Sequence, residues 1–474
     1  MYRFIPLFLL SFVCSHALSA QDQQKPLNIL FLAVDDLTPR LGCYGDTQVI
    51  TPNIDKLAAS GTVFLNNHCQ WAVCGPSRAS LMSGLRPETT GVMDLKTKWR
   101  ESNPDILSLP EHFKNNGYIT AGAGKIYDPR CVDSKDQCDA PSWTLPFAKI
   151  PYNKIIKDGK QFAEAHDCPD EKLADGQIAL SGLKFMKQLA AQDKPFFLAV
   201  GFKKPHLPFV SPKKYWDLYQ REKIQLNSFQ ERARNASEYG WHFGSELRSY
   251  KGIPKEGDLS PELQAEVIHG YMASVSYIDA QIGLLLNELE KLGLKDNTAI
   301  VLWSDHGFHL GDHAMWGKHS NLEQSTRSPL IFSIPEHKDI KSTQAPSELL
   351  DIYPTLCDAA GLEIPKSLHG KSLLPILNGS KKSVKKGAIS FFKSKGAHGY
   401  AYRTEKHRYI EWIKQGEVVA RELYDYGKDP HEKINQALNP EYKSIMISLA
   451  QDLRREAQDC AVLESVKGAS LSDL

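Results

Sequence analysis

Two short apolar runs that end in acidic residues constrain the fold of this chain most strongly. The runs are residues 28–34 (NILFLAV) and 299–303 (AIVLW), and the polar residues that follow them are Asp35, Asp36, Asp305 and His306. Apolar runs of this length are typical of strands buried on both faces of a sheet. Either acidic end alone would also suit a turn or a helix cap. Adjacent carboxylates at a buried strand end repel each other unless a cation lies between them, so together the two ends predict a site for Ca²⁺ or Mg²⁺.

Predicted helices alternate with further apolar strands along most of the chain. Helices are expected at residues 54–60, 107–116, 174–191, 266–291 and 347–360, and strands at 196–200 and 329–332. This alternation predicts an α/β fold with a large mixed, mostly parallel sheet, flanked by helices on both faces. Ligands of such sheets bind at the carboxyl ends of the strands. The stripe of Tyr271, Val275, Ile278 and Ile282 on the long helix is interpreted as core.

The character of the sequence changes after residues 370–379, which read as a linker. Short alternating segments at 388–392, 399–404 and 409–412 predict a small antiparallel sheet, followed by a helix at about 440–456. We expect the chain to divide into a signal peptide (1–20), a main α/β domain (25–378), which the motifs below make the catalytic domain, and a C-terminal α+β subdomain (385–474). Residues 221–262 are charged without clear periodicity and are interpreted as a surface insertion. The basic run 381–386 is interpreted as a solvated linker.

Charge and targeting signals indicate an exported protein. The 474 residues contain 57 Lys and Arg against 56 Asp and Glu, so no overall basic field points to nucleic acid as a partner. Arg3 precedes the apolar run 4–13 and a group of small residues, a pattern that predicts a secretory signal peptide cleaved near Ser19 or Ala20. We expect a secreted or periplasmic protein. Since no other run approaches about 20 apolar residues, we expect no membrane span.

Nine cysteines remain to be assigned. Cys14 would leave with the signal peptide. In an oxidising compartment, a disulfide among Cys131, Cys138 and Cys168 is expected. Cys357, inside a predicted helix, is expected to be buried and inert. The chain has no Cys-x-x-Cys pair, which argues against a structural zinc site.

The segment around Cys74 carries the most specific chemical signal. Residues 74–84 read CGPSRASLMSG, which resembles the maturation signature of the type I sulfatases. In that family the cysteine is oxidised to formylglycine by a formylglycine-generating enzyme. The hydrated aldehyde can attack a sulfate ester through one oxygen and later expel the sulfate through the other. The alternative interpretation is a structural or disulfide cysteine in a Pro-Ser turn.

Further segments resemble the iduronate 2-sulfatases and their bacterial relatives, in the family's order. They are residues 34–37 (VDDL), 41–46 (LGCYGD), 51–55 (TPNID), 99–100 (WR), 124–125 (GK), 204–209 (KPHLPF), 304–307 (SDHG) and 316–318 (WGK). The resemblance implies an alkaline-phosphatase-like fold. It implies a calcium ion, completed by residue 74, with the ligands Asp35, Asp36, Asp305 and His306.

The same resemblance implies roles for residues that meet the substrate. Arg78 and Lys125 would stabilise the formylglycine and the sulfate oxygens, Lys318 would bind the sulfate, and His206 would protonate the leaving alcohol; Trp99, Arg100 and His319 are expected at the substrate. Fixed cations and a metal lower the barrier because the departing oxygen gathers negative charge. Imidazole can act as an acid near neutral pH, although a lone histidine is more often structural.

One position departs from the family. Relatives carry a histidine three residues after the lysine equivalent to Lys125, where this chain has Asp128. That histidine is thought to take the proton from the diol when sulfate is eliminated. Asp128 could serve as this base, or it could only order the loop before Pro129. The two alternatives stay open on the sequence.

The sequence favours a sulfatase acting on sulfated oligo- or polysaccharides. The expected reaction is removal of a 2-O-sulfate from a uronic acid at the end of a chain such as ulvan or a glycosaminoglycan. One alternative is a galactose sulfate of a carrageenan-type polysaccharide. Another is a phosphomonoesterase or phosphonate hydrolase of the same superfamily, and the zinc site that this would need is weakened rather than excluded by the nearby His309 and His313. An inactive glycan-binding protein is disfavoured, because the catalytic positions are intact.

Overall fold

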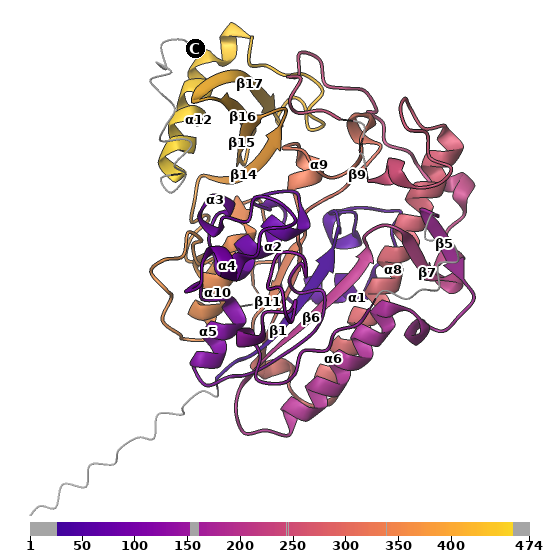
Figure 1. Ribbon diagram of the computed structural model, residues 1–474, viewed down its shortest axis with the longest axis vertical. Coiled ribbons are helices and arrows are strands. Elements are labelled where there is room, and N and C mark those ends of the chain that lie inside the picture. Colours follow the sequence, from indigo (N-terminus) through magenta and orange to yellow (C-terminus); the bar gives the residue numbers. More distant parts are fainter. Residues whose placement is uncertain (1–25, 152–160, 243, 245, 338, 458–474) are drawn as a thin grey trace, which may run out of the picture.

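A twisted seven-stranded sheet with helices on both faces forms the centre of the molecule (Figure 1). The computed structural model describes residues 26–151, 161–242, 244, 246–337 and 339–457. The predicted signal peptide lies outside the described residues, as do Cys14 and Cys460. None of the helices in the described part of the chain combines the length and the apolar character needed to cross a membrane.

The predicted mostly parallel sheet is confirmed. In spatial order its strands are β12 (Ser342–Thr343), β2 (Thr62–Phe64), β11 (Leu330–Ser333), β8 (Thr298–Ser304), β1 (Asn28–Asp35), β6 (Phe196–Pro205) and β4 (Ile119–Gly124). The four strands β8-β1-β6-β4 run parallel to one another, while β11 is antiparallel to both of its neighbours. The fold is therefore mixed α/β, with its long central strands all pointing the same way.

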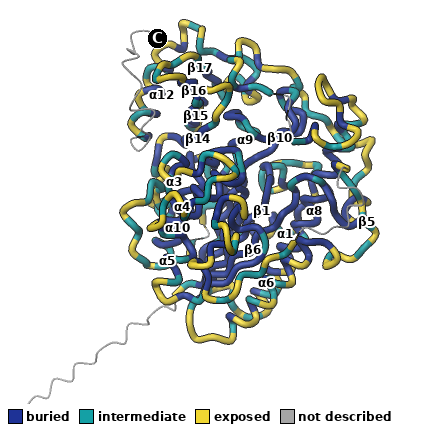
Figure 2. Tube along the Cα trace, viewed as in Figure 1, coloured by how far each residue is buried: buried dark blue, intermediate teal, exposed yellow. Residues whose placement is uncertain are grey.

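Alternate side chains of the central strands pack into two separate hydrophobic cores, one on each face of the sheet. Leu30 and Leu32 of β1 face one core, while Phe31 and Ala33 face the other, as the two-residue period of a strand requires. The first core is covered by α1 (Pro52–Ala59), α6 (Ala174–Ala190) and α8 (Pro261–Lys291). The second is covered by α2 (Cys74–Ser83), α5 (Leu109–Asn115) and α10 (Ile352–Ala359). Figure 2 shows the central strands buried along their lengths.

Local signals set the ends of the predicted helices. α5 begins with a capping box between Ser108 and Glu111 and is followed by Gly117 at φ 88°. α8 begins at Pro261, after Ser260, whose side chain accepts a hydrogen bond from the third helical N–H. The helix predicted over 347–360 is shorter than expected. Its first residues form the two-residue strand β13 (Ser347–Glu348) and a 3₁₀ turn before α10 starts.

Short elements fill the connections. They are β3 (Asn67–His68), β5 (Ala163–His166), β7 (Phe209–Pro212), β9 (His309–Leu310), β10 (Trp316–Gly317), α3 (Pro87–Thr90), α4 (Trp99–Ser102), α7 (Lys213–Trp216), α9 (Glu323–Thr326) and α11 (Leu374–Leu377). The predicted linker at 370–379 contains α11, and its Ile376 and Leu377 are buried in the second core. The basic run after it is also not simply solvated, because Lys385 is buried and pairs with Glu348 and Asp351. Both expectations are corrected.

The C-terminal part forms a four-stranded antiparallel sheet covered by one helix. Its strands, in both sequence and spatial order, are β14 (Gly387–Ser394), β15 (Ala397–Thr404), β16 (His407–Lys414) and β17 (Glu417–Asp425), and the helix is α12 (Lys443–Glu456). The predicted strands and final helix are confirmed, and β17 is an additional strand. Met446, Leu449 and Leu453 of α12 pack on the apolar side of this sheet.

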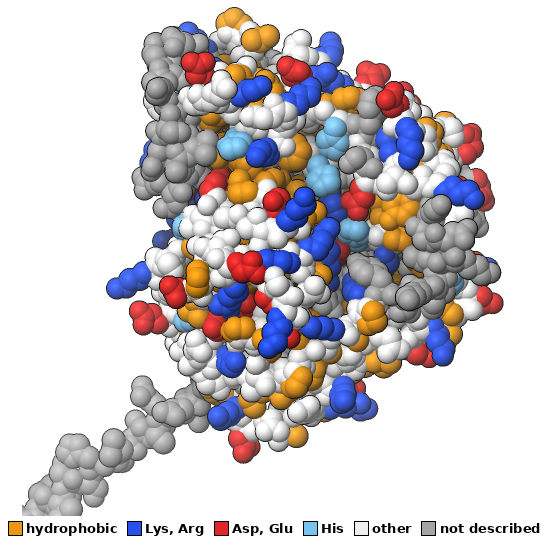
Figure 3. Space-filling model, viewed as in Figure 1, with side chains coloured by type: hydrophobic (Ala, Val, Ile, Leu, Met, Phe, Trp, Pro, Cys, Tyr) orange, Lys and Arg blue, Asp and Glu red, His pale blue; other side chains and the backbone are white. Residues whose placement is uncertain are grey.

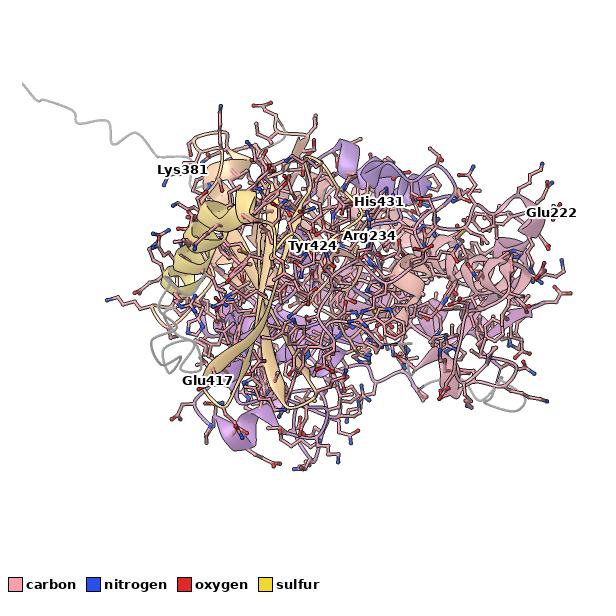
Figure 4. The ribbon with its side chains drawn as sticks, turned by 90° about the horizontal axis from the view of Figure 1, so that it is seen from above. Glu222, Arg234, Lys381, Glu417, Tyr424 and His431 are labelled. Atoms are coloured by element: carbon pink, nitrogen blue, oxygen red, sulfur yellow. The ribbon has the colours of Figure 1, made fainter. Side chains whose placement is uncertain are left out.

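Residues 221–262 are more than a surface insertion. Arg234 pairs with Ile434 as an isolated bridge, and the Tyr239 ring stacks on Trp412 of β16 at 5.5 Å. Figure 4 shows Arg234 close to the labelled C-terminal residues Tyr424 and His431, while Glu222, near the start of the insertion, lies at the far end of the molecule. The segment therefore crosses the catalytic domain and joins it to the C-terminal sheet.

The expected disulfide is not present. All seven described cysteines are free thiols. Cys131 Sγ points to the carbonyl of Asp94 at 3.4 Å and packs against Gly75, whereas Cys138 lies in a loop whose backbone is held by Asp133. The predicted burial of Cys357 in a helix is confirmed.

Candidate active site

Four neighbouring strand ends bring the predicted polar residues to one edge of the sheet. The residues at or just after these ends are Asp35 of β1, Lys125 after β4, His206 after β6 and Asp305 after β8. Because β8, β1, β6 and β4 are adjacent and parallel, side chains that are far apart in sequence converge here. This is the edge at which open α/β sheets bind their ligands.

Cys74 is the first residue of α2, and its side chain points into this convergence. Sγ lies 3.3 Å from Nε2 of His306, 3.5 Å from Nζ of Lys318 and 3.7 Å from Oδ1 of Asp36. Burial raises the pKa of the Cys74 thiol well above its ordinary value, although the charges of Lys125 and Lys318 act in the opposite direction. Residue 74 therefore stands where carboxylates, an imidazole and cations meet.

The side chains around Cys74 can hold a metal ion. Ligand atoms within 4.8 Å of one another are offered by Asp36, Cys74, Asp305 and His306, and an overlapping group is formed by Asp35, Asp36, Cys74 and His206. The three aspartates and His306 are completely buried. Carboxylate oxygens suit a hard cation.

The orientation of His306 supports this interpretation. Its Nδ1 lies 2.9 Å from the carbonyl oxygen of Gly307, which assigns the Nδ1–H as donor. Nε2 then presents a lone pair to Oδ1 of Asp36 at 3.3 Å and to Oδ2 of Asp305 at 3.7 Å. A lone pair and two carboxylates repel one another unless a cation lies between them. The donor set therefore fits a metal ion.

The backbone at Asp36 has an unusual conformation that hydrogen bonds hold in place beside the cluster. Asp36 has φ 61°, a left-handed conformation that costs a non-glycine residue about 1 kcal/mol or more. The hydroxyl of Tyr271 donates to the Asp36 carbonyl at 2.9 Å, and the Asp36 N–H donates to Oδ1 of Asp305 at 3.1 Å. The predicted burial of the Tyr271 stripe is confirmed, and its first member also anchors the site.

Arg78 binds the carboxylates from below. Its Nη2 and Nε lie 3.0 Å from Asp35 and 3.0 Å from Asp305, and Nη1 donates to the carbonyls of Lys125 and Ile126. The guanidinium is completely buried and does not line the pocket described below. Arg78 therefore positions the two aspartates, and its expected stabilisation of formylglycine and of the sulfate oxygens stays a prediction.

Two lysines reach the cluster from above. Lys125 Nζ lies 2.6 Å from Oδ2 of Asp35, and Lys318 Nζ lies 2.8 Å from each carboxylate oxygen of Asp36. Burial alone would raise the pKa of Asp36, but the neighbouring positive charges, with His206 and Lys318 the largest, outweigh it and hold that pKa below its usual range. Both lysines line the pocket, where their ammonium groups can bind an anion.

His206 presents one ring nitrogen to the pocket. Nδ1 lies 2.6 Å from the Leu207 carbonyl, which leaves Nε2 directed toward the cluster, 4.0 Å from Oδ2 of Asp36. Lys204 Nζ donates to the carbonyls of His206 and Pro208 at 2.5 and 2.8 Å, and thereby fixes the loop. The ring is placed to exchange a proton with a bound molecule.

Glu246 is a site residue that the sequence did not reveal. Its carboxylate bridges His206 Nε2 at 3.2 Å and Lys318 Nζ at 3.3 Å. Although burial acts to raise it, the charges of Lys318 and His206 lower the pKa of Glu246. The residue lies in the insertion, where no periodicity or motif marks it. Only the path of the insertion back over the strand ends brings it here.

Asp128 is held by a neighbour. Its carboxylate accepts hydrogen bonds from the backbone N–H of Arg130 at 3.0 Å, from Nε at 2.9 Å and from Nη2 at 2.7 Å. Burial would raise its pKa, but the hydrogen bonds from Arg130 and the charge of Lys125 lower it to about 2. So weak a base is poorly suited to accept a proton, and the geometry favours the loop-ordering alternative.

Two expected substrate contacts are wrong. Trp99 is 1% exposed and packs in the second core, 5.3 Å from the Tyr127 ring. Arg100 uses its guanidinium on Asp139 and Glu111. Neither residue is among those that line the pocket. His319 does line the pocket, as expected.

His309 and His313, which left a zinc site possible on the sequence, lie away from the cluster at residue 74. His309 Nε2 contacts Ser320 Oγ at 3.1 Å, and His313 packs edge-on against Phe229. Within the described ranges neither joins a group of potential metal ligands. The cluster at residue 74 thus offers carboxylates with one or two imidazoles, which favours a single hard cation.

A cavity of about 800 Å³ opens above residue 74. Its cationic lining residues are Lys125, Arg130, Lys149, Lys203 and Lys318, and its acidic ones are Asp128 and Glu246. Figure 3 shows Lys, Arg and His side chains gathered around a hollow near the middle of the face that is drawn. A pocket of this size and charge is suited to an anionic molecule larger than sulfate alone.

Comparisons with known proteins agree with this chemistry. The family described as Sulfatase matches residues 27–362, and the family described as N-sulphoglucosamine sulphohydrolase, C-terminal, matches residues 311–459. A sulfatase of Formosa agariphila is 34% identical over 446 residues, covering 90% of this chain and 85% of that protein. Human iduronate 2-sulfatase is 32% identical over 521 residues, covering 90% and 94%.

A solved structure shows the same fold. It is a complex of a protein with its substrate D-glucosamine-2-N,6-O-disulfate, and it superposes with a TM-score of 0.77 at 23% identity. The superposition covers 93% of this chain and 100% of the other.

Proposed function

This chain belongs to the sulfatase family and is a sulfuric ester hydrolase, and we propose that it removes a 2-O-sulfate from a uronic acid at the non-reducing end of a sulfated glycan. The observation that carries the proposal is the similarity to iduronate 2-sulfatase along 90% of the chain, combined with a cationic pocket above residue 74. A pocket closed by strand-end loops favours a terminal sugar over an internal one.

We propose that Cys74 is the precursor of formylglycine and that the neighbouring cluster holds calcium. The ligands would be Asp35, Asp36, Asp305 and His306, whose donor atoms are mostly carboxylate oxygens. Formylglycine would supply a nucleophilic oxygen and a second hydroxyl for release of sulfate, and the metal would offset negative charge at the reacting centre. The partner that this requires is a formylglycine-generating enzyme.

The other residues have roles that follow from their positions. Lys125 and Lys318 line the pocket next to residue 74, so their ammonium groups would bind the sulfate oxygens. His206 Nε2 faces the same space and would donate a proton to the departing alcohol oxygen. Arg78 would act through the aspartates that it holds.

The signal peptide remains part of the proposal. An enzyme that acts on extracellular polysaccharide must meet its substrate outside the cytoplasm, and the first twenty residues have the charge and apolar pattern of an export signal. We therefore propose a secreted or periplasmic enzyme that takes part in polysaccharide degradation.

A substrate panel tests the specificity. The matured enzyme is incubated with oligosaccharides that carry a terminal 2-O-sulfated uronate, with galactose sulfates of carrageenan type, and with a phosphate monoester and a phosphonate monoester. We expect sulfate release mainly from the uronate. Release from the carrageenan fragments alone would contradict the uronate assignment and keep the reaction class. Turnover of the phosphorus esters alone would contradict the physiological role proposed here.

A further inference from the structure

The wall of the pocket nearest residue 74 is a tight turn at 128–131. The Cys131 N–H donates to the Asp128 carbonyl at 2.9 Å, with Pro129 at the second position, an arrangement that favours a type I turn. Cys131 lies against Gly75, so close that a Cβ added to that glycine would meet Sγ at 2.5 Å. The turn is therefore seated directly on the first turn of α2, beside residue 74.

Arg130 is the member of this turn that faces the cavity. Its side chain is 52% exposed and it lines the pocket. Lys98 Nζ donates to the Arg130 carbonyl at 2.6 Å, which fixes the backbone beneath it. The guanidinium is thus carried on a rigid turn, next to the reacting position but above the buried cluster.

Asp128 orients this guanidinium without covering it. Two of its hydrogen bonds go to Nε and Nη2, along one edge of the planar group. Among the described residues, none accepts a hydrogen bond from Nη1, and the side chain that carries it lines the pocket. An arginine held along one edge by a carboxylate is preorganised to bind a second anion along the other.

Charge in the cavity makes a second anion favourable. Lys149 and Lys203 also line it, and Lys203 Nζ donates a hydrogen bond to the Ile150 carbonyl at the pocket wall. These cations lie outside the set that holds the carboxylates at the base of the pocket, which uses Lys125 and Lys318. The cavity therefore has more positive charge than one sulfate monoester requires.

We infer that Arg130, positioned by Asp128, forms a subsite for a second anionic group of the substrate, a carboxylate or a further sulfate, next to the sulfate ester that is hydrolysed. The inference rests on the proposed sulfatase action on anionic glycans. It explains the acidic residue at position 128: the carboxylate serves the arginine two residues later, and its own negative charge is neutralised by that partner.

Two matched pairs of substrates test the subsite. The first pair is a 2-O-sulfated uronate disaccharide and the same sugar with its carboxyl group reduced to an alcohol. The second is a neutral disaccharide with one sulfate and the same sugar with two. For each pair, kcat/KM is measured for the wild type and for Arg130→Gln, with Arg130→Lys to retain the charge and Arg221→Gln as control. Arg221 is a partly exposed arginine paired with Glu266 away from the pocket.

We expect the wild type to prefer the more anionic member of at least one pair. Arg130→Gln should reduce that preference about tenfold through KM, since a charged hydrogen bond contributes about 1.5 kcal/mol. Arg130→Lys should fall between, and Arg221→Gln should match the wild type. A reduced preference in the first pair identifies a carboxylate, and in the second pair a sulfate. An unchanged preference in both pairs, with all variants folded by thermal melting, overturns the inference.

Failure of the proposed function has a different signature. If the wild type released no sulfate from either uronate substrate, the uronate assignment would fail. The pair of sulfated neutral disaccharides would still report on Arg130. If Arg130→Gln fails to fold, the Arg130→Lys variant tests the inference instead. Lysine keeps the charge but loses the bidentate hydrogen-bond geometry of arginine, so the preference for the more anionic substrate must still fall.

Discussion

Three carboxylates and three cationic side chains meet beneath the pocket, and their formal charges cancel. The carboxylates are Asp35, Asp36 and Asp305, and the cations are Arg78, Lys125 and Lys318. A divalent metal in the cluster would leave this floor with an excess of about two positive charges, of which the Glu246 carboxylate beside Lys318 offsets one. A sulfate monoester carries one negative charge, and more gathers on its oxygen as the S–O bond breaks. The excess positive charge therefore stabilises the transition state more than the bound substrate, because the transition state carries more negative charge on the departing oxygen.

Glu246 should matter most when the leaving group is poor. The change Glu246→Gln removes the charge that bridges His206 and Lys318 while it keeps the side-chain shape. A less well placed acid should lower kcat on a sulfated sugar by about tenfold. An aryl sulfate with an acidic phenol needs little protonation, so its kcat should change less. Steady-state kinetics on both substrates measures the difference.

The matched control is Glu238→Gln, in the same insertion, where Glu238 pairs with Lys395 on the surface. It should resemble the wild type on both substrates. An equal loss of kcat on the sugar and the aryl sulfate in Glu246→Gln would contradict a role through His206.

At the scale of single residues, motifs predicted the cluster around Cys74 and the Lys and His side chains beside it, but they missed Glu246. Cys74 and the acidic strand ends were predicted because each belongs to a short motif of consecutive residues. Glu246 was missed because only the path of a long insertion brings it to His206. Trp99 and Arg100 were placed wrongly, since sequence proximity to a motif does not tell which side of a loop a residue faces.

At the scale of elements, a buried ion cluster joins the catalytic domain to the C-terminal sheet. Glu348 of β13 accepts from Arg86 Nη1 at 2.9 Å, from Lys385 Nζ at 2.6 Å and from the Ile389 N–H of β14 at 3.1 Å. Burial would raise the pKa of Glu348, but the charges of Arg86 and Lys385 outweigh it and hold that pKa below the ordinary 4.5. Glu348 is thus ionised in the folded protein.

Glu348→Gln should destabilise the fold in a pH-dependent way. Removing one partner of a buried ion pair costs about 3 kcal/mol at neutral pH. Because the folded-state pKa lies below that of the unfolded chain, the contribution is present above the ordinary value of 4.5 and is lost as the pH falls through the folded value. Thermal melting from pH 7 downward should show a large gap between wild type and variant that narrows below about pH 4.5.

Glu417→Gln is the control for this series. Glu417 is exposed at the start of β17, and Figure 4 shows it at the edge of the molecule. Its melting curve should follow the wild type at every pH. A gap for Glu348→Gln that stayed constant from neutral to acid pH would show that its charge does not contribute.

Element prediction succeeded where periodicity was strong. The long α8 and the buried strands β1 and β8 were predicted from their apolar patterns, and the helix ends from capping residues. β17 was missed because its sequence at 417–421 alternates weakly and carries two charged residues. The segment 370–379 was predicted to be a linker because it begins and ends with glycine, although Ile376 and Leu377 of α11 are buried.

At the scale of the whole molecule, metal binding should couple the ends of β1 and β8 and so stabilise the fold. The carboxylates come from β1 and from the residue after β8, which are adjacent strands of the central sheet. A ligand bound only by the folded state stabilises it by about 2.7 kcal/mol at a concentration one hundred times its dissociation constant. Chelation should therefore lower the melting temperature and abolish sulfate release together.

Add-back identifies the metal. Calcium should restore both the melting temperature and the activity of the chelated protein, and elemental analysis of the untreated protein should find one calcium per chain. Asp35→Asn should weaken this recovery. Stoichiometric zinc without calcium would contradict the hard-cation assignment.

The most direct test is the mass of the peptide that contains residue 74, measured on the same preparation as its activity. Co-expression with a formylglycine-generating enzyme should yield a peptide lighter than the cysteine form, because one oxygen replaces the sulfur and two hydrogens are lost. Sulfate release per mole of protein should rise in proportion to the converted fraction, and Cys74→Ala should be folded and inactive. Full activity from protein whose residue 74 is entirely unmodified cysteine would contradict the account.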